Sequence, residues 1–498
     1  MYQSKFQQLT FENFHLPFGG KLDPENRWVK LADVIPWHVA ETMYAKNFMS
    51  KRGAPALTVR MALGSLIIKE KLGLSDIETV EQIKENPYLQ FFIGLEAYQQ
   101  AAPFDSSMLT HFRKRLKHTD LAALQEELLQ RHLAEERKRA QDREENKDGD
   151  DDGNVGPANK GKLIVDATCA PADIAYPTDI SLLNDAREKT ERIIDKLCEM
   201  HPEGVAKPRM SRRTARKDFL AVGMKKSLSR KALRKGLRKQ LSYLRRNLQY
   251  IGGLSASVPL TVLSKRLYRD LLVIDELYRQ QYEMYKIEKK SISDRIVSIS
   301  QPHVRPIVRG KAAAKTEFGM KLSISVVDGI SMPERMSWNA YNEGCDLVRD
   351  IERYRERYGR YPESVHADKI YRTLANRQWC KERGIRLSGV PLGRPPKDVE
   401  KNRARRRQIR EDEGIRNAVE GKFGQAKRRY GLARVMARLA ESSLCVVSIT
   451  FLVMNLDRLL AAPFLRLFEW LLLELDVIRN LFKWSSSRAT MKCCWAMA

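Results

Sequence analysis

The sequence predicts an α/β protein in which a mixed β-sheet holds a large basic helical insertion and follows an all-helical N-terminal region. Short apolar, β-rich runs recur at 162–168, 319–327 and 364–367, and amphipathic helical patterns separate the later ones. One long helical stretch, about 181–290, interrupts the strand pattern. Strands followed by alternating helices and strands favour a mixed sheet over an all-helical or all-β architecture.

Several further elements complete the predicted α/β region. We expect residues 174–179 to return as the hairpin partner of the first strand, and residues 384–389 to form a short strand. Amphipathic patterns predict helices over 345–358, 373–383 and 416–438, the last one containing glycines at which it could bend.

Length and composition indicate a folded protein with a basic surface. A chain of 498 residues suggests about three domains. Hydrophobic residues make up 43% and charged residues 30%, which excludes a disordered or fibrous chain. The excess of 89 Lys+Arg over 62 Asp+Glu gives a formal net charge of +27. Such an excess favours a polyanionic partner, of which DNA, RNA and anionic membranes are the usual examples.

Secretion and membrane insertion are not predicted. The N-terminus lacks the charged-then-apolar layout of a signal peptide. The longest uncharged apolar run, Ser442 to Leu456, is shorter than the about 20 residues that a spanning helix needs, so we expect a buried helix there. The seven cysteines include no C-x-x-C pair, which argues against a zinc ribbon or a disulfide scaffold. We therefore expect a cytoplasmic protein with reduced thiols and no membrane partner.

Helix-start signals define the N-terminal region, residues 1–140. Ser75 and Glu78 form a capping box, in which each side chain satisfies a backbone N–H at the start of a helix. The apolar face of that helix would comprise Ile77, Val80 and Ile83. The preceding apolar stripe ends at Gly73, which suits a helix C-terminus.

A third helix of this region starts near Asp105 and carries Arg113 and Lys114 away from its apolar face. Short helices joined by tight turns, the last one basic, fit a DNA-binding domain. An ordinary helical packing domain is the alternative, because helix-turn-helix geometry leaves a weak mark in sequence.

The rest of the chain divides by composition. Residues 141–161 are acidic and hold almost nothing to bury, which predicts a flexible linker. Their Asp cluster lacks the Glu and the spacing of a calcium loop. Residues 162–460 form the α/β domain, and residues 461–498 a helical tail.

The basic charge is concentrated in the helical insertion. Residues 207–246 contain 16 Lys+Arg and one acid, Asp218, a net charge of +15. Leucines at helical spacing supply a packing face, and the cations predicted to project from it are Arg234, Lys235, Arg238, Lys239, Arg245 and Arg246. We expect these cations to bind DNA phosphates. A membrane-surface helix is disfavoured because the apolar face lacks Trp and Phe, and a merely solvated face is the remaining alternative.

Three acids are candidates for metal-dependent chemistry on phosphodiesters. Asp166 and Asp368 each end an apolar strand, and Glu420 lies on a helix face with Arg416 and Lys427. Two-metal phosphodiester chemistry needs carboxylates that converge from separate elements. Each acid alone also fits a cap, a turn or a surface ion pair, so the combination carries the prediction.

Other polar residues fit a catalytic role less well. Asp179 and Asp328 lie beside predicted turns. Residues Lys315, Glu317 and Lys321 either support the site, bind DNA or are exposed strand charges, and His366 either orients a neighbour or packs.

Five stretches resemble the DDE transposases of bacterial insertion sequences, specifically the insertion-sequence-four and insertion-sequence-five groups, which have an RNase H-like catalytic core. The matching stretches cover residues 163–168, 174–179, 315–319, 365–372 and 416–427. Residues 74–113 are similar to the helical domain that precedes these cores. The family signature Tyr-x2-Arg-x3-Glu-x6-Lys is matched at Arg416, Glu420 and Lys427, but Glu413 holds the tyrosine position.

The resemblance implies a function and a set of site residues. Asp166 would bridge two Mg²⁺ ions per active site, with Asp368 and Glu420 each holding one; Mn²⁺ could substitute. Arg416 and Lys427 would contact DNA near the scissile bond. The implied partners are double-stranded DNA, as transposon ends and as target, and a second copy of the chain in a synaptic homodimer.

The implied reaction is hydrolysis at the terminal inverted repeats, followed by attack of the freed 3′-hydroxyl on target DNA. The spacing of 368 − 166 = 202 residues between the aspartates is long for such a core, and the helical insertion accounts for it. Two alternatives stay open: a catalytically inactive DNA-binding derivative, and an RNase H-like nuclease without strand transfer.

Overall fold

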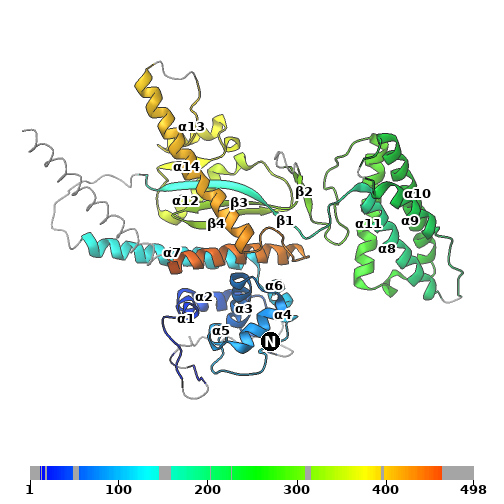
Figure 1. Ribbon diagram of the computed structural model, residues 1–498, viewed down its shortest axis with the longest axis horizontal. Coiled ribbons are helices and arrows are strands. Elements are labelled where there is room, and N and C mark those ends of the chain that lie inside the picture. Colours follow the sequence, from blue (N-terminus) through cyan, green and yellow to red (C-terminus); the bar gives the residue numbers. More distant parts are fainter. Residues whose placement is uncertain are drawn as a thin grey trace, which may run out of the picture. The chain divides into compact units, whose positions relative to one another are not determined.

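The chain divides into two compact units, and each is described by itself. The computed structural model describes residues 12, 14–16, 20–48, 55–144, 159–201, 204–225, 227–308, 316–393 and 398–461 (Figure 1). The first unit combines the residues up to 158 with 326–332 and the chain from 448 on. The second unit comprises 159–325 and 333–447. The predicted tail beyond residue 461 lies outside the described residues, as do residues 145–158 of the predicted linker.

The first unit is helical, as the sequence predicts for the N-terminal region. Its helices are α1 (Arg27–Val34), α2 (Trp37–Ala45), α3 (Val59–Leu72), α4 (Asp76–Glu85), α5 (Pro87–Phe92), α6 (Met108–Arg115) and α7 (His118–Glu144). Helix α3 ends at Gly73, whose φ of 69° is the left-handed conformation that favours glycine at a helix C-terminus. Helix α7 extends four residues into the segment expected to be linker.

The capping signal in α4 is confirmed, and one residue of its apolar face is wrong. The Ser75 hydroxyl accepts a hydrogen bond from the Glu78 backbone N–H at 3.1 Å. Val80 and Ile83 are buried, but Ile77 is 68% exposed. Ile77 lies in the first turn of α4, whose buried residues are Thr79, Val80 and Ile83.

The apolar run near the C-terminus belongs to a helix, Ala440–Ala461, whose length and composition would allow it to cross a membrane. However, 61% of its most apolar window is buried inside the protein. In the first unit it is held by polar contacts: Gln125 of α7 donates to the Ser448 carbonyl at 3.1 Å, and Lys71 of α3 forms an ion pair with Asp457. A buried helix, as predicted, accounts for these contacts.

The predicted mixed sheet lies in the second unit, except for residues 326–332, which belong to the first. Its strands are β1 (Lys162–Pro171), β2 (Arg305–Val308), β3 (Thr316–Val327), β4 (Ile330–Ser337), β5 (Ser364–Ala367) and β6 (Arg386–Leu387). The order is β2-β3-β1-β5-β6, with β4 also paired to β3. Strands β1, β5 and β6 pair in parallel, whereas β2 and β3 are antiparallel. Asp328 and Gly329 both have positive φ and form the tight turn between β3 and β4.

Two predictions about this unit are wrong. Residues 174–178 form no strand; Thr178 instead caps α8 by accepting from the Ser181 N–H, and β1 has β3 and β5 as its neighbours. Helix α14 (Val399–Arg429) begins 17 residues before the predicted start and ends before Gly431. Its first half is so rich in charged residues that it lacks the regularly spaced apolar residues by which a helix is predicted. Asp398 caps the helix by accepting hydrogen bonds from two backbone N–H groups.

The remaining helices of this unit follow the predicted pattern. They are the 3₁₀ turns η4 (Glu343–Cys345) and η5 (Lys369–Tyr371) and the helices α12 (Leu347–Tyr358) and α13 (Leu374–Glu382). Helix α14 packs on β1 and β5 and crosses them (Figure 1).

The helical insertion between β1 and β2 is a bundle (Figure 1). Its long helices are α8 (Asp179–Glu199), α9 (Arg212–Gly223), α10 (Arg230–Ser255) and α11 (Lys265–Ile287). Two apolar clusters hold it together, one around Leu183, Leu244 and Ile274, and the other around Ile194 and Ile251. The leucine face predicted on α10 is thus the packing face.

Candidate functional site

The register of the parallel strands brings two predicted site residues side by side. Val165 of β1 is paired with Ala367 of β5, so Asp166 and Asp368 occupy the next positions along this register. Neighbouring strands lie about 4.8 Å apart, and residues at matched positions point to the same face. The structure therefore brings Asp166 next to Asp368. The expectation that each aspartate ends a strand is correct for Asp368, which directly follows β5, and wrong for Asp166, which lies inside β1.

Each aspartate is fixed by its own local hydrogen bond. One Asp166 oxygen accepts from the Ala167 N–H at 2.8 Å, and one Asp368 oxygen accepts from the Lys369 N–H at 2.7 Å. The second bond caps η5, which starts immediately after β5. Each carboxyl group keeps a second oxygen that these bonds do not use.

The environment of Asp166 is acidic and partly desolvated. The pKa of its carboxyl is raised to about 6, chiefly because a buried charge loses hydration. The charges of Glu343 and Asp368 contribute to this rise, whereas the Ala167 N–H and the Arg416 guanidinium oppose it. Neighbouring carboxylates repel one another, and a bound cation would relieve this repulsion.

The third predicted acid, Glu420, lies on α14 and differs from Asp166 in being exposed and paired with a cation. The Glu420 carboxylate is 3.4 Å from the Arg416 guanidinium, one helical turn earlier, and its side chain is 59% exposed. Arg416 in turn acts on Asp166. Lys427 lies in the last turn of the same helix. The structure thus connects Glu420 to the aspartate pair through Arg416.

The donor chemistry of the aspartate pair fits a hard divalent cation. Carboxylate oxygens are the ligands that Mg²⁺ and Mn²⁺ prefer. Within the described parts of the chain, no three His, Cys, Asp or Glu side chains are close enough together to form a complete metal site. Two adjacent donors are therefore in place, and Glu420 is turned toward Arg416 instead.

Several residues beside the aspartates were not predicted as site residues. Glu343 acts on Asp166, and its carboxylate is 2.7 Å from the Lys321 ammonium. Arg372 donates to the Ala367 carbonyl at 2.8 Å, directly before Asp368. Tyr371 is fully buried. Glu343 lies in a turn, where no hydrophobic periodicity shows which way a side chain points. The only sequence signal for its role is its position between a predicted strand and a predicted helix.

His366 has a structural role. It is buried on β5, and its Nε2 lies 3.0 Å from the Ser364 hydroxyl. Its Nδ1 lies 3.7 Å from Asp412 of α14, which also accepts two hydrogen bonds from Arg386 at 2.8 Å. This network attaches α14 to β5 and β6. Lys315, a further candidate, lies outside the described residues.

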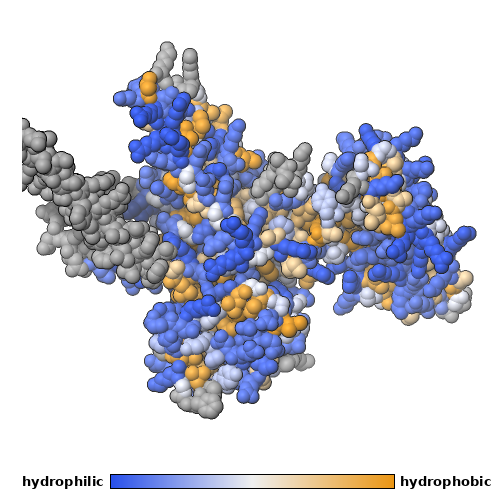
Figure 2. All heavy atoms as spheres, in the orientation of Figure 1, coloured by the Kyte–Doolittle hydropathy of each residue, from blue (hydrophilic) through white to orange (hydrophobic). Residues whose placement is uncertain are grey.

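The cations predicted on α10 fall into two groups. Lys239 pairs with Asp218 at 2.6 Å, and Arg246 donates to the Met210 carbonyl. Lys235, Arg238 and Arg245 are exposed. Figure 2 shows that hydrophilic side chains dominate the visible face of the bundle. The exposed cations are better suited to contact phosphates than the cations that already have partners within the protein.

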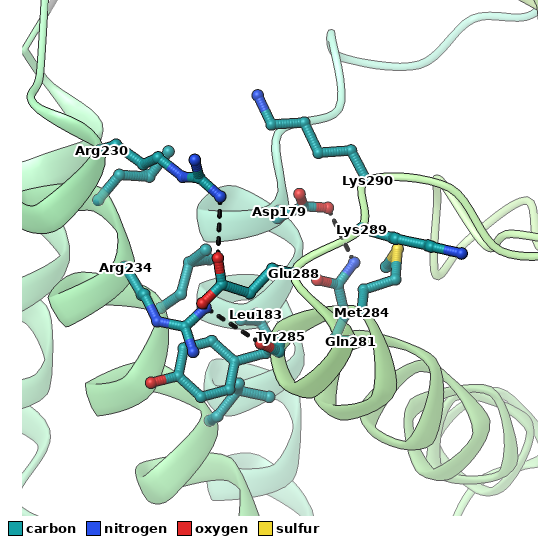
Figure 3. A pocket seen from close by; sticks show the side chains of 13 residues that line it. Asp179, Leu183, Arg230, Arg234, Gln281, Met284, Tyr285, Glu288, Lys289 and Lys290 are labelled. Atoms are coloured by element: carbon teal, nitrogen blue, oxygen red, sulfur yellow. Dashed lines mark hydrogen bonds and ion pairs between the residues drawn. The ribbon is translucent and has the colours of Figure 1, made fainter.

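Arg234 belongs to the paired group and lines a pocket between α8, α10 and α11 (Figure 3). Its guanidinium lies 3.0 Å from Glu288, donates to the Tyr285 carbonyl at 3.2 Å and stacks on the Tyr285 ring. At another wall of the pocket Asp179 accepts hydrogen bonds from Gln281 at 3.0 Å and from Arg295 at 2.6 Å. Asp179 thus serves the packing of the bundle.

The two cations predicted on α6 also differ. Arg113 forms two hydrogen bonds with Asp76 at the start of α4, at 3.0 and 2.6 Å, and Lys69 pairs with the same carboxylate at 3.0 Å. Although burial alone would raise it, these cations lower the pKa of Asp76. Arg113 therefore ties α6 to α4, whereas Lys114 is exposed.

Comparisons with known proteins match two parts of the chain. Residues 365–457 match the family model described as "Transposase DDE domain", a span that includes Asp368 and Glu420. Residues 17–115 match the model described as "Transposase domain (DUF772)". An "Uncharacterized protein ORF8 in nfe locus" of Rhizobium meliloti is 35% identical over 161 residues, which are 32% of this chain and 69% of that protein. No solved structure matches the chain.

Proposed function

This chain belongs to the DDE transposases of insertion sequences, and on that premise we propose that it binds the terminal inverted repeats of its own element, cuts there with divalent metal ions and joins the freed ends to target DNA. The observation that carries the proposal is the adjacency of Asp166, inside β1, and Asp368, directly after the parallel strand β5. A sheet that combines the antiparallel pair β2–β3 with the parallel strands β1, β5 and β6 supports the RNase H-like core that the resemblance implies.

Asp166, Asp368 and Glu420 would hold the metal ions. Bound Mg²⁺, or Mn²⁺ in its place, supplies a Lewis acid that activates the attacking oxygen and stabilises the leaving one. Asp166 would face both ions because it lies at the buried centre of the acidic group. Glu420 would reach the site by leaving Arg416, to which it is bound through a mostly exposed and therefore weak pair.

The two steps differ in their nucleophile. In the first, water attacks the phosphodiester at the element's end, which leaves a 3′-hydroxyl on one side and a 5′-phosphate on the other. In the second, that 3′-hydroxyl attacks a target phosphodiester, so that one ester bond forms as another breaks. Arg416 and Lys427, on the helix that carries Glu420, would hold the phosphates of the reacting strand.

Binding of long DNA would fall to the exposed cations outside the site. Lys235, Arg238 and Arg245 on α10 and Lys114 on α6 are suited to phosphates. We expect two copies of the chain to hold two element ends in one complex, with the protein acting on bacterial DNA in the cytoplasm.

The test is a cleavage and joining assay with purified protein, Mg²⁺, labelled DNA from the gene's flanks and a target plasmid. Asp368→Ala should bind the labelled ends with wild-type affinity and cut them at least 10²-fold more slowly. Glu356→Gln, an exposed acid on α12, should cut like the wild type.

The outcomes separate the alternatives. Equal cleavage by wild type and Asp368→Ala would remove these acids from the reaction. Cleavage without joining would favour a nuclease, and binding without cleavage by the wild type would favour an inactive DNA-binding derivative.

A further inference from the structure

Glu343 is a partly buried acid on the turn that precedes α12. Its side chain is 16% exposed and its carboxylate is 2.7 Å from the ammonium of Lys321, whose side chain is 13% exposed. Lys321 also donates to the Tyr341 carbonyl at 2.7 Å. A cation on β3 thus holds the acid inside the protein, beside the strands that carry the site.

The turn that carries Glu343 is attached to the turn that follows Asp368. The Asn376 side chain donates to the Gly344 carbonyl at 2.7 Å and to the Tyr371 carbonyl at 2.8 Å, and thereby bridges η4 and η5. A Cβ at position 344 would lie 2.5 Å from the Ile370 carbonyl oxygen, so glycine is needed for this close approach. The Asn376 side chain and the close approach at Gly344 therefore hold the backbone of η4, which carries Glu343, against η5, which follows Asp368.

A buried tyrosine lies beside these acids. Tyr371 is 0% exposed, and its hydroxyl has the Ser323 side chain of β3 as its hydrogen-bond partner. Burial raises the pKa of Tyr371, and the charges of Glu343 and Asp166 raise it further, whereas the Ser323 hydrogen bond lowers it. Glu343 and Asp166 thus act on the same buried hydroxyl, which indicates that both acids lie near it.

We propose that Glu343 is a further carboxylate ligand of the divalent cation held by Asp166 and Asp368, with Lys321 as its counter-ion when no cation is bound. This inference rests on the proposed function and deepens it. The acid comes from a turn after the β3–β4 hairpin, whereas Glu420 comes from a helix, so the two approach the aspartates from different elements. The competing explanation is that the Lys321–Glu343 pair only ties β3 to η4.

Two substitutions with opposite expected effects distinguish these roles. Mn²⁺ binding to the full chain is measured by electron paramagnetic resonance, without DNA. Glu343→Gln should weaken Mn²⁺ binding at least tenfold, because a charged donor is lost. Lys321→Met should strengthen binding or leave it unchanged, because a competing cation is removed. A purely structural pair predicts equal losses of thermal stability in both variants, and the same effect on Mn²⁺ affinity in both, whether none or a loss.

Reference variants keep the result interpretable. Asp166→Asn should lose Mn²⁺ binding, and Glu356→Gln should bind like the wild type. Wild-type affinity in Glu343→Gln together with loss in Asp166→Asn would overturn the inference and leave the proposed function standing. Wild-type affinity in Asp166→Asn would overturn the proposed function itself. Weaker binding in both Glu343→Gln and Lys321→Met would overturn the inference in favour of the structural pair.

A second measurement covers the case in which Glu343→Gln does not fold. Fe²⁺ bound to the wild-type chain reduces added H₂O₂ to hydroxide and a hydroxyl radical that cuts the backbone close to the metal, and ascorbate returns the Fe³⁺ to Fe²⁺. Cuts near both residue 343 and residue 368 that disappear in Asp166→Asn support the proposal. Cuts near 368 without any near 343 would contradict it.

Discussion

Arg416 and Glu420 lie one turn apart on α14, with Nη1 of the arginine 3.4 Å from Oε1 of the glutamate. The same guanidinium lowers the pKa of Asp166 on β1. One cation thus serves an acid on the helix and an acid on the sheet. This arrangement keeps Glu420 next to the site while its side chain remains mostly exposed.

Arg416→Gln should slow DNA cleavage about 10²-fold in single-turnover assays, because it removes a positive charge from a site where negative charge develops. Affinity for element ends should fall less than tenfold, since many other cations contact the DNA. Arg407→Gln is the matched control, because Arg407 lies on the same helix and pairs with Glu411 at 2.9 Å. Wild-type cleavage by Arg416→Gln would contradict a role in the reaction.

Glu70→Gln should stabilise the protein at pH 8 and not at pH 4. Burial raises the pKa of Glu70 to about 7, although a hydrogen bond with Thr450 and the charge of Lys69 oppose this. A folded pKa above the unfolded one means that the native state binds the proton more tightly, so this stabilisation is lost as pH rises through about 7.

The expected gain for Glu70→Gln at pH 8 is about 3 kcal/mol, since each pKa unit corresponds to about 1.4 kcal/mol. Calorimetric Tm values of variant and wild type at the two pH values measure it. Glu81→Gln, on the exposed side of α4, should show no such pH-dependent difference. A difference of equal size at both pH values would refute the assignment to Glu70 ionisation.

Arg113→Ala and Lys114→Ala should have different phenotypes although the residues are adjacent. Loss of the Arg113–Asp76 hydrogen bonds should cost about 1–3 kcal/mol and lower Tm. Lys114→Ala should leave Tm unchanged and weaken DNA binding, with a salt dependence shallower by about 0.9. The reverse pattern would show that Arg113 contacts DNA.

The triple variant Lys235→Gln, Arg238→Gln and Arg245→Gln should fold normally and bind DNA with a flatter salt dependence. Each lost phosphate contact should reduce the slope of log K against log salt by about 0.9. Arg279→Gln on α11 is the control, because Glu276 and Glu283 already neutralise that cation. An unchanged slope in the triple variant would remove this face of α10 from the DNA interface.

The sequence predicts the parallel strands and the aspartate pair because both depend on local pattern. An apolar run followed by an acid predicts a strand near that carboxylate, and the parallel pairing of β1 with β5 brings the two acids together. Asp166 itself lies inside β1, which continues to Pro171. The helical bundle is similarly marked by leucines at helical spacing.

The predictions fail where the role of a residue depends on contacts with residues that are distant in the sequence. Arg113 reads as a surface cation, because Asp76, its partner, is 37 residues away in the sequence. The expected partner of β1 at 174–179 failed because β3 and β5 already occupy both of its edges. Glu343 was missed because its position depends on the packing of one turn on another, which Gly344 and Asn376 achieve without any periodic signal.

The parallel pairing of β1 with β5 also sets the order of events during synthesis. The ribosome adds the 368 − 166 = 202 residues between the aspartates in about 10–40 s, at about 5–20 residues per second. Until β5 is made, the nascent chain has Asp166 without the strand that brings Asp368 beside it, while the contacts within α8–α11 are nearer in sequence and form sooner. A product terminated after α11 and before β5 would therefore carry the cations proposed to bind DNA without the proposed cutting centre, and would compete with the full chain for element ends.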